Sequence, residues 1–237
     1  MKPRCANAKP VPCRARVTAV RALAAEVLEA ELAMIEPPTL AFEAGQWVSV
    51  PFGPKNVRAY SIASTPRSTS SITLCADVAP DGPGSRWFRA LAPGGEIEFK
   101  GPLGGFVWAD TETRRPLFVA EEIGIVPIRA ILMTLDERGV EIAGTLVYGA
   151  RDAGWLVYDD ELRALARRRP GFAYHPIVPT DEPGESGEIA SAVDRLVTDV
   201  GGLVAYVAGG EATINRVREV LIAKGLERRA VKWEKFW

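Results

Sequence analysis

The sequence is poor in the residues that hold metal ions. Its 237 residues include one histidine, His175, and three cysteines, Cys5, Cys13 and Cys75, without Cys-x-x-Cys spacing. A zinc site, an iron–sulfur cluster or a disulfide framework is therefore not expected. Such cysteine usage is typical of a reducing compartment, so we expect a cytoplasmic protein whose redox chemistry, if any, depends on a bound organic cofactor. His175, alone in a strand pattern, is expected to be structural.

The sequence also lacks an excess of charge and a long apolar run. It has 29 Lys and Arg against 30 Asp and Glu, a net charge of -1. Neither nucleic acid nor an anionic membrane is an expected partner, because neither would meet a basic field. No apolar run approaches the roughly 18 residues that suggest a membrane span. The basic N-terminus has no apolar segment of the kind found in secretory signals, so residues 1–15 are expected to be flexible.

The first half of the chain has the pattern of an all-β domain. Short strand-like runs are broken by glycine and proline, and a helical pattern over residues 84–91 interrupts them. These features predict a β-barrel or sandwich over residues 16–110. The expected strands cover residues 17–21, 27–35, 47–51, 59–64, 71–78 and 96–99.

The pattern changes after about Val107. Continuous apolar runs, typical of buried parallel strands, now alternate with helical patterns. This alternation predicts a doubly wound α/β domain with a parallel sheet over residues 111–237. The expected strands cover residues 116–120, 144–148, 172–177 and 203–207, the expected helices cover 127–137, 159–168 and 212–224, and an acidic, mobile loop is expected at 180–187.

Residues 58–64 (RAYSIAS) combine a cation, a phenol and hydroxyls in one extended segment. In a strand, Arg58, Tyr60, Ile62 and Ser64 would share one face. Arginine donates to phosphate oxygens, tyrosine offers a stacking surface and serine can bind a ring heteroatom. The segment is therefore a candidate face for a large, flat, phosphorylated ligand. The alternative is an ordinary half-buried strand with Arg and Tyr at its rim.

Three loops follow predicted strands of the α/β half, at residues 121–125, 149–151 and 208–211. Ligands of open parallel sheets bind outside the carboxyl ends of the strands. Two of the loops combine glycine with the start of a helix, where backbone N–H groups can approach a pyrophosphate. The loops are candidate nucleotide-binding elements, although glycines after strands also form simple turns.

Several motifs together resemble those of the ferredoxin–NADP reductase family. The resemblance extends over residues 16–237 and depends on the order and spacing of the motifs. It implies a two-domain protein, with an N-terminal antiparallel six-stranded β-barrel that binds FAD and a C-terminal domain that binds a nicotinamide nucleotide. The motifs are residues 58–64 (RAYSIAS), 82–85 (GPGS), 101–104 (GPLG), 124–127 (GIVP), 148–151 (YGAR) and 234–237 (EKFW).

The resemblance also implies roles for single residues. Arg58 would contact the flavin pyrophosphate, Tyr60 would pack against the isoalloxazine and Ser61 would hydrogen-bond near its reactive N5. Trp237 would stack on the flavin with Glu234 nearby, so Ser61, Glu234 and Trp237 are the expected catalytic residues. Further expected cofactor contacts are Ile62, Ser64, Leu74, Cys75, Gly82, Gly84 and Ser85, and the expected nucleotide contacts are Gly124, Pro127, Arg151, Asp159, Gly209 and Gly210.

The nucleotide half departs from the family pattern. Glu121 and Glu122 stand where the family usually has two small residues, and Ala208 replaces the usual cysteine near the nicotinamide. Each carboxylate would repel a pyrophosphate by about 1 kcal/mol even at water-like screening. Asp159, at a position that is often basic in members that bind a 2′-phosphate, favours NADH, whereas Arg151 favours NADPH.

The sequence thus predicts a flavin-dependent oxidoreductase that transfers hydride between NADH or NADPH and FAD. It would pass electrons to a separate acceptor, which could be a redox protein such as ferredoxin or flavodoxin, or a small molecule. The alternative, motivated by Glu121, Glu122 and Ala208, is a flavin-bearing electron-transfer or regulatory subunit with impaired or lost nucleotide binding. A structural protein without a cofactor is a third possibility.

Overall fold

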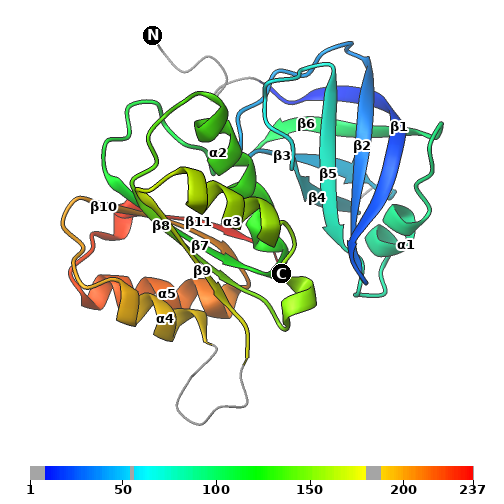
Figure 1. Cartoon of the computed structure of the whole chain (residues 1–237). Coiled ribbons are helices and arrows are strands. Elements are labelled where there is room, and N and C mark those ends of the chain that lie inside the picture. The colour runs from blue at the N-terminus through cyan, green and yellow to red at the C-terminus, as the bar shows by residue number, and fades with distance from the viewer. Residues whose placement is uncertain (1–8, 54–55, 180–187, 237) are drawn as a thin grey trace. The chain divides into compact units, whose positions relative to one another are not determined.

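A computed structural model of the chain describes residues 9–53, 56–179 and 188–236 (Figure 1). Its internal contacts divide the chain into two units. The first unit comprises Met1–Thr111 and Arg129–Thr134, and the second comprises Glu112–Ile128 and Leu135–Trp237. Each unit is built around its own sheet.

The sheet of the first unit is antiparallel, with the strand order β4-β3-β6-β1-β2-β5. Its two outer strands meet through a bridge between Ile62 and Leu74 and through a 2.7 Å hydrogen bond from the Ala63 N–H to the Thr73 carbonyl. The sheet therefore closes into the predicted six-stranded barrel. Its strands are β1 (Val11–Ala24), β2 (Val27–Glu36), β3 (Trp47–Pro51), β4 (Val57–Ser61), β5 (Ser71–Asp77) and β6 (Glu96–Leu103).

Strand β1 begins earlier than the sequence predicted. The expectation of a flexible segment over residues 1–15 was wrong from Val11 onward, where β1 pairs with β6 in register, Val11 opposite Gly101. The reason is the strand period, because Cys13, Ala15 and Val17 all point into the barrel and are buried. Residues 1–8 lie outside the described part of the chain.

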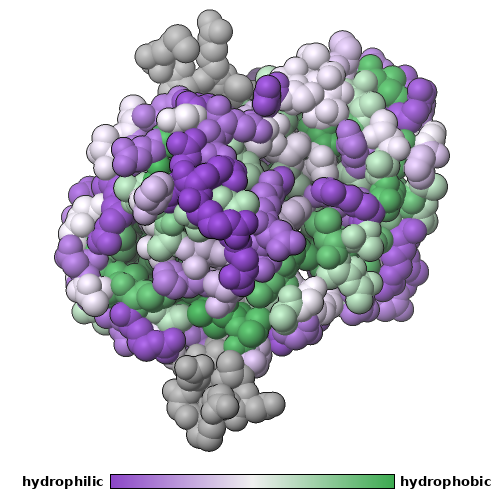
Figure 2. Space-filling model, viewed as in Figure 1, coloured by the Kyte–Doolittle hydropathy of each residue, from purple (hydrophilic) through white to green (hydrophobic). Residues whose placement is uncertain are grey.

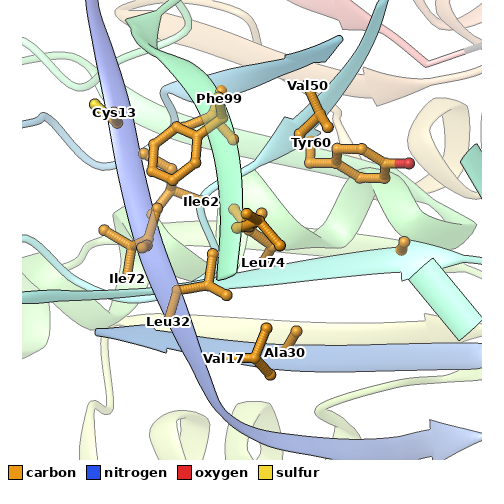
Figure 3. Close-up of a cluster of buried hydrophobic side chains, with 14 of the residues drawn as sticks. Cys13, Val17, Ala30, Leu32, Val50, Tyr60, Ile62, Ile72, Leu74 and Phe99 are labelled. Atoms are coloured by element: carbon orange, nitrogen blue, oxygen red, sulfur yellow. The ribbon is translucent and has the colours of Figure 1, made fainter. Parts of the chain in front are cut away.

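The barrel is filled by aliphatic and aromatic side chains from its strands (Figure 3). Leu32, Ile62, Ile72 and Leu74 have no exposed surface. The helix α1 (Pro83–Arg89) joins this core through Phe88, which is also fully buried. The core thus fixes β4 and α1, which carry five of the eleven residues predicted to bind flavin.

The second unit contains a five-stranded parallel sheet with the order β11-β10-β7-β8-β9. The chain runs outward from β7 to β9 and then returns to the other side of β7, as the predicted doubly wound fold requires. Helix α3 lies on one face of the sheet, and α4 and α5 lie together on the other (Figure 1). The elements are β7 (Arg115–Glu121), α2 (Ile125–Glu137, of which Arg129–Thr134 belongs to the first unit), β8 (Gly144–Gly149), α3 (Asp159–Arg168), β9 (Phe172–Ile177), α4 (Ile189–Leu196), β10 (Leu203–Gly209), α5 (Glu211–Ala223) and β11 (Val231–Lys235).

Two of these elements were not predicted. Helix α4 spans 8 residues, and β11 is a 5-residue strand at the edge of the sheet. Segments this short show little more than two periods of either pattern, so tertiary packing decides their structure. The predicted mobile loop at residues 180–187 lies outside the described residues.

Neither a metal centre nor a membrane helix is found in the described segments. No three His, Cys, Asp or Glu side chains there are grouped so that they could hold a metal ion. No helix among the same residues is long and apolar enough to cross a membrane. Cys13 and Cys75 are both buried free thiols.

Candidate functional site

Strand β4 and the start of α1 form one continuous surface of the first unit. A Cβ atom added to Gly84 would lie 2.8 Å from the Tyr60 hydroxyl oxygen and 3.2 Å from Arg58 Cγ. Arg58 and Tyr60 therefore share a face of β4, as the strand period predicted, and this face contacts the first turn of α1. Only glycine at position 84 permits so close an approach.

Tyr60 is held firmly and remains neutral. Its ring lies 5.5 Å, centroid to centroid, from both Trp87 and Phe88. Burial raises the pKa of its phenol to about 12. The ring lies at the edge of the core with its hydroxyl directed away from the other labelled side chains (Figure 3). Only 8% of Tyr60 is exposed, so it offers a ligand a smaller stacking surface than the sequence implied.

Arg58 lies at the exposed end of the same face. Its Nη1 donates to Asn56 Oδ1 over 2.7 Å and to the Val57 carbonyl over 2.9 Å. Both acceptors are neutral, and within the described segments no carboxylate forms an ion pair with this guanidinium. Its positive charge is therefore not compensated locally, which suits the binding of a phosphate group.

The other predicted flavin residues of the barrel are mostly internal. Ile62 and Leu74 are fully buried in the core, so only their backbone can contact a cofactor. The hydroxyl of Ser64 accepts a 3.1 Å hydrogen bond from the Thr73 backbone N–H and thereby ties the end of β4 to β5. Cys75, Ser61 and their neighbours are also largely covered, with 3% and 5% of the two residues exposed.

The start of α1 is open to an anion. Gly82 precedes the helix in an extended conformation, and no side chain caps the first turn. The first N–H groups of a helix have no acceptor within the helix, although Pro83 contributes none. A Cβ at Gly82 would meet nothing within 4 Å. Gly82, Gly84 and Ser85 thus stand where backbone donors remain for a phosphate, next to Arg58.

The first unit also has a cavity that lies away from the Arg58 and Tyr60 face of β4. Its volume is about 730 Å³, and its walls include Pro12, Glu36, Val57 and Lys100. None of the residues predicted to bind flavin lines it. Its size alone gives it no chemistry, so the flavin assignment depends on the donors of β4 and α1.

The second unit has a cavity of about 250 Å³ at the carboxyl ends of its strands. The loops after β7 and β8 and the first turns of α4 and α5 surround it. Of the predicted nucleotide contacts, only Arg151 lines it. Its other charged walls are Glu121, Glu122, Glu188 and Arg216, so it carries three carboxylates and two guanidiniums.

Glu121 occupies the start of α5. One carboxylate oxygen accepts the Gly210 N–H over 2.8 Å, and the other accepts the Thr213 hydroxyl over 2.6 Å. A Cβ at Gly209 would lie 2.7 Å from Glu121 Cβ. The sequence predicted that these glycines approach a nucleotide. In the structure they make room for Glu121 and bind its charge at the positive end of a helix dipole.

Glu122 holds Arg151. Its Oε1 accepts the Arg151 backbone N–H over 2.8 Å and the side-chain Nε–H over 3.1 Å. The guanidinium also lies over the Trp155 ring, 3.7 Å from its centroid. Arg151, whose charge was expected from the sequence to favour NADPH, is therefore already paired with Glu122.

Gly124 and Pro127 have roles in the packing and helix geometry of the second unit. A Cβ at Gly124 would lie 2.2 Å from the carbonyl oxygen of Ala208, so the loop after β7 packs directly on the backbone of β10. Pro127 is buried in the first turn of α2, where its missing N–H has no helical partner. Neither residue lines the cavity.

Asp159 does not line the cavity either. Its carboxylate accepts the Tyr174 hydroxyl and the Arg163 Nε–H, each over 2.7 Å. Burial, and then the hydrogen bond to Asp159, raise the pKa of the Tyr174 phenol. Asp159 is the first residue of α3, and hydrophilic residues gather on the surface over this helix (Figure 2). The structure thus gives Asp159 partners other than the ribose predicted from the sequence.

The C-terminal residues run along β10. Glu234 lies opposite Ala208 in the parallel pair of β10 and β11, and it is half-buried. The Phe236 N–H donates to the Gly209 carbonyl over 3.1 Å, which holds the chain end beside the glycine loop. Trp237, predicted to stack on the flavin, lies outside the described residues.

Sequence reasoning missed five residues of the cavity wall, which are Glu188, Ile189, Ala190, Thr213 and Arg216. Thr213 binds Glu121 across 92 positions of sequence, and Arg216 pairs with Glu188 across 28. Patterns of neighbouring residues in the sequence cannot predict contacts between residues so far apart in the chain. Thr213 had one weak signal, because a threonine in the first turn of a helix often serves as a hydrogen-bonding group.

Comparisons with known proteins agree with these features. A family model described as an oxidoreductase FAD-binding domain matches residues 14–108. Ferredoxin–NADP reductase B of Sorangium cellulosum is 30% identical over 238 residues, which cover 95% of this chain and 98% of that protein.

Two further proteins are similar over most of this chain but are longer. The reductase component of propane 2-monooxygenase from Rhodococcus jostii is 25% identical over 94% of this chain, which spans 63% of that protein. The crystal structure of the cytochrome P450 reductase GcoB from Amycolatopsis is 26% identical with a TM-score of 0.84, and the match covers 96% of this chain and 70% of that one. On the whole-length match to the Sorangium protein, the chain belongs to the ferredoxin–NADP reductase family.

Proposed function

We propose that this protein oxidises a reduced nicotinamide nucleotide at FAD and passes the electrons to a separate redox protein such as a ferredoxin or flavodoxin. Family membership and the flavin-domain match make the chain an FAD-dependent oxidoreductase. When bound, FAD supplies the chemistry that accepts hydride and releases single electrons. The observation that carries the proposal is the uncompensated charge of Arg58 beside the open start of α1.

The residues of the first unit would divide the work of holding the cofactor. Arg58 and the backbone donors of Gly84 and Ser85 would bind the pyrophosphate, because a cation and a helix start both attract phosphate. Tyr60, fixed by Trp87, would provide a rigid apolar edge for the isoalloxazine. Ser61 at the end of β4 remains our proposed hydrogen-bond partner near N5.

The second unit would receive the nicotinamide nucleotide at the carboxyl edge of its sheet. The repulsion expected from Glu121 and Glu122 is reduced, since hydrogen-bond donors and Arg151 compensate both carboxylates. The same pairing favours a second candidate, a flavin-bearing electron-transfer subunit with impaired nucleotide binding. Arg151 and Arg216, the cations that would bind phosphate, are engaged by Glu122 and Glu188.

The electron acceptor and the compartment belong to the same proposal. The names of two relatives, a ferredoxin–NADP reductase and a monooxygenase reductase component, support a redox protein as acceptor. A small molecule is the other possible acceptor. The buried free thiols of Cys13 and Cys75 support a reducing, cytoplasmic compartment. The net charge of -1 supports neither nucleic acid nor an anionic membrane as partner.

The flavin part of the proposal is tested with Arg58→Ala and Tyr60→Ala. Protein purified and incubated with FAD is titrated by fluorescence, and each variant should bind FAD at least about tenfold more weakly. Arg16→Ala is the matched control, because it removes the same charge from an exposed ion pair with Glu96. Unchanged FAD affinity in Arg58→Ala would remove this residue from the site.

The electron-transfer part is tested with the acceptors. Wild-type protein with FAD and NADH or NADPH is offered ferredoxin, flavodoxin and a small-molecule dye in separate assays. Steady reduction of a protein acceptor supports the proposed function. Reduction of the dye alone identifies a small-molecule reductase, and no reduction of any acceptor supports the subunit.

A further inference from the structure

Glu122 stands at a conformation that its residue type seldom adopts. It follows β7 with φ = 50°, in the left-handed region that favours glycine. Such backbone is kept where the surrounding structure demands it, and these positions cluster at ligand sites. The conformation places the carboxylate within reach of Arg151, 29 residues along the chain. Both residues of this pair line the cavity of the second unit.

The two oxygens of this carboxylate have different surroundings. Oε1 accepts both N–H groups of Arg151 described above. Oε2 is buried and has no hydrogen-bond partner among the residues that the structure describes. Only 12% of the Glu122 side chain is exposed. Charge in such a poorly solvated place is weakly screened, so Glu122 attracts the Arg151 guanidinium strongly.

Every other cationic feature of the cavity is matched by a carboxylate. Arg216 pairs with Glu188, and the positive start of α5 holds Glu121. With Glu122 and Arg151 included, the walls carry three carboxylates against two guanidiniums, a formal charge of -1. A ligand that brings an additional phosphate group would find no unpaired cation there and would meet the net negative charge of the walls.

We propose that Glu122 makes this cavity select NADH over NADPH, because it engages Arg151 and leaves the cavity walls with a net negative charge that repels a 2′-phosphate. The inference rests on the proposed function, in which the cavity receives the nicotinamide nucleotide. In this proposal the preference for NADH over NADPH is set by Glu122 in the loop after β7 and not by Asp159. The Asp159 carboxylate binds Tyr174 and Arg163 outside the cavity. Since NADPH differs from NADH by one dianionic phosphate, the selection needs no other contact.

The test compares Glu122→Gln with wild type. Glutamine keeps the shape and an oxygen acceptor for Arg151 but removes the charge. Wild type should reduce its flavin with NADH at a kcat/KM at least about tenfold above that with NADPH. In Glu122→Gln, kcat/KM for NADPH should rise by about tenfold while the value for NADH changes much less, and adding Arg151→Ala should abolish the gain.

A binding measurement without turnover separates selection from chemistry. Calorimetric titration with adenosine 2′,5′-bisphosphate and with AMP should show that Glu122→Gln improves only the binding of the bisphosphate. Glu219→Gln is the matched control, because Glu219 is exposed on α5 and does not line the cavity. This control should leave both affinities unchanged.

The outcomes distinguish this inference from the proposed function. A wild type that prefers NADPH, or a nucleotide preference that Glu122→Gln leaves unchanged, overturns the role of Glu122 and leaves the reductase intact. Failure of both NADH and NADPH to reduce the flavin overturns the proposed function itself, and with it the inference.

Discussion

The close packing of the loop after β7 on β10 makes Gly124 a position that does not tolerate a side chain. In Gly124→Ala the new Cβ would lie 2.2 Å from the Ala208 carbonyl oxygen, 2.6 Å from its carbon and 3.0 Å from the Gly209 nitrogen. All three are backbone atoms, so no side chain can rotate away. The loop and the strand must separate by about 1 Å or more to approach the roughly 3.5 Å of an ordinary contact.

That separation has a stability cost and a functional cost. Overpacking of this kind costs about 1–3 kcal/mol, and because backbone must move we expect roughly 3 kcal/mol and a fall in Tm of roughly 6–12 °C. The shift also displaces Gly209 and Gly210, whose N–H binds Glu121, so nucleotide affinity should fall. Flavin binding should be unaffected, since Arg58 and Tyr60 belong to the first unit.

The assay combines thermal unfolding with titration of NADH against the FAD-loaded protein. Gly105→Ala is the matched control, because a Cβ there would meet nothing within 4 Å and the residue has no positive φ. It should change Tm by less than about 1 °C. A Gly124→Ala protein with the Tm and nucleotide affinity of wild type would refute the backbone contact between this loop and β10.

Two further predictions concern stability. The Arg114 guanidinium, which donates to both oxygens of Glu112 over 2.7 Å, holds the pKa of that carboxyl below its ordinary value of 4.5. A lowered pKa stabilises the fold above pH 4.5, and this stabilisation is lost as the pH falls through the lowered value. The difference in unfolding free energy between wild type and Glu112→Gln should therefore shrink in acid, and a difference that grows there would contradict the ion pair. Leu74→Ala, at a fully buried barrel position, should lower the unfolding free energy by about 2–5 kcal/mol in urea denaturation, whereas a loss below about 1 kcal/mol would contradict the described core.

Much of the fold could be predicted because local patterns and tertiary structure agree. Helix α3 has its predicted bounds, Asp159–Arg168, since acidic residues fill its first turn and basic residues its last. Strands β3 and β9 also match their predicted bounds, because turn residues or proline flank short apolar runs. Helix α4 and strand β11 were missed because segments of about two periods give only a weak pattern, and packing against the rest of the second unit decides their structure.

The candidate sites were less predictable than the fold. The shared face of Arg58 and Tyr60 follows from the strand period alone. The arrangement of Glu121 does not, because its partners Gly210 and Thr213 are 89 and 92 residues away. From sequence, its carboxylate was a repulsive charge in a phosphate loop. In the structure the carboxylate is held by two hydrogen bonds, and these bonds join residues too far apart in the sequence to be predicted from it.

Anaerobic stopped-flow absorbance is the most direct test of whether a nicotinamide nucleotide reduces the flavin of this protein. FAD-loaded protein is mixed with NADH or NADPH while the flavin band is followed. The band should bleach within seconds with NADH, more slowly with NADPH, and return when ferredoxin or another oxidised acceptor is added. A flavin that stays bound and oxidised with both nucleotides would contradict the proposed function and identify the protein as an electron-transfer subunit.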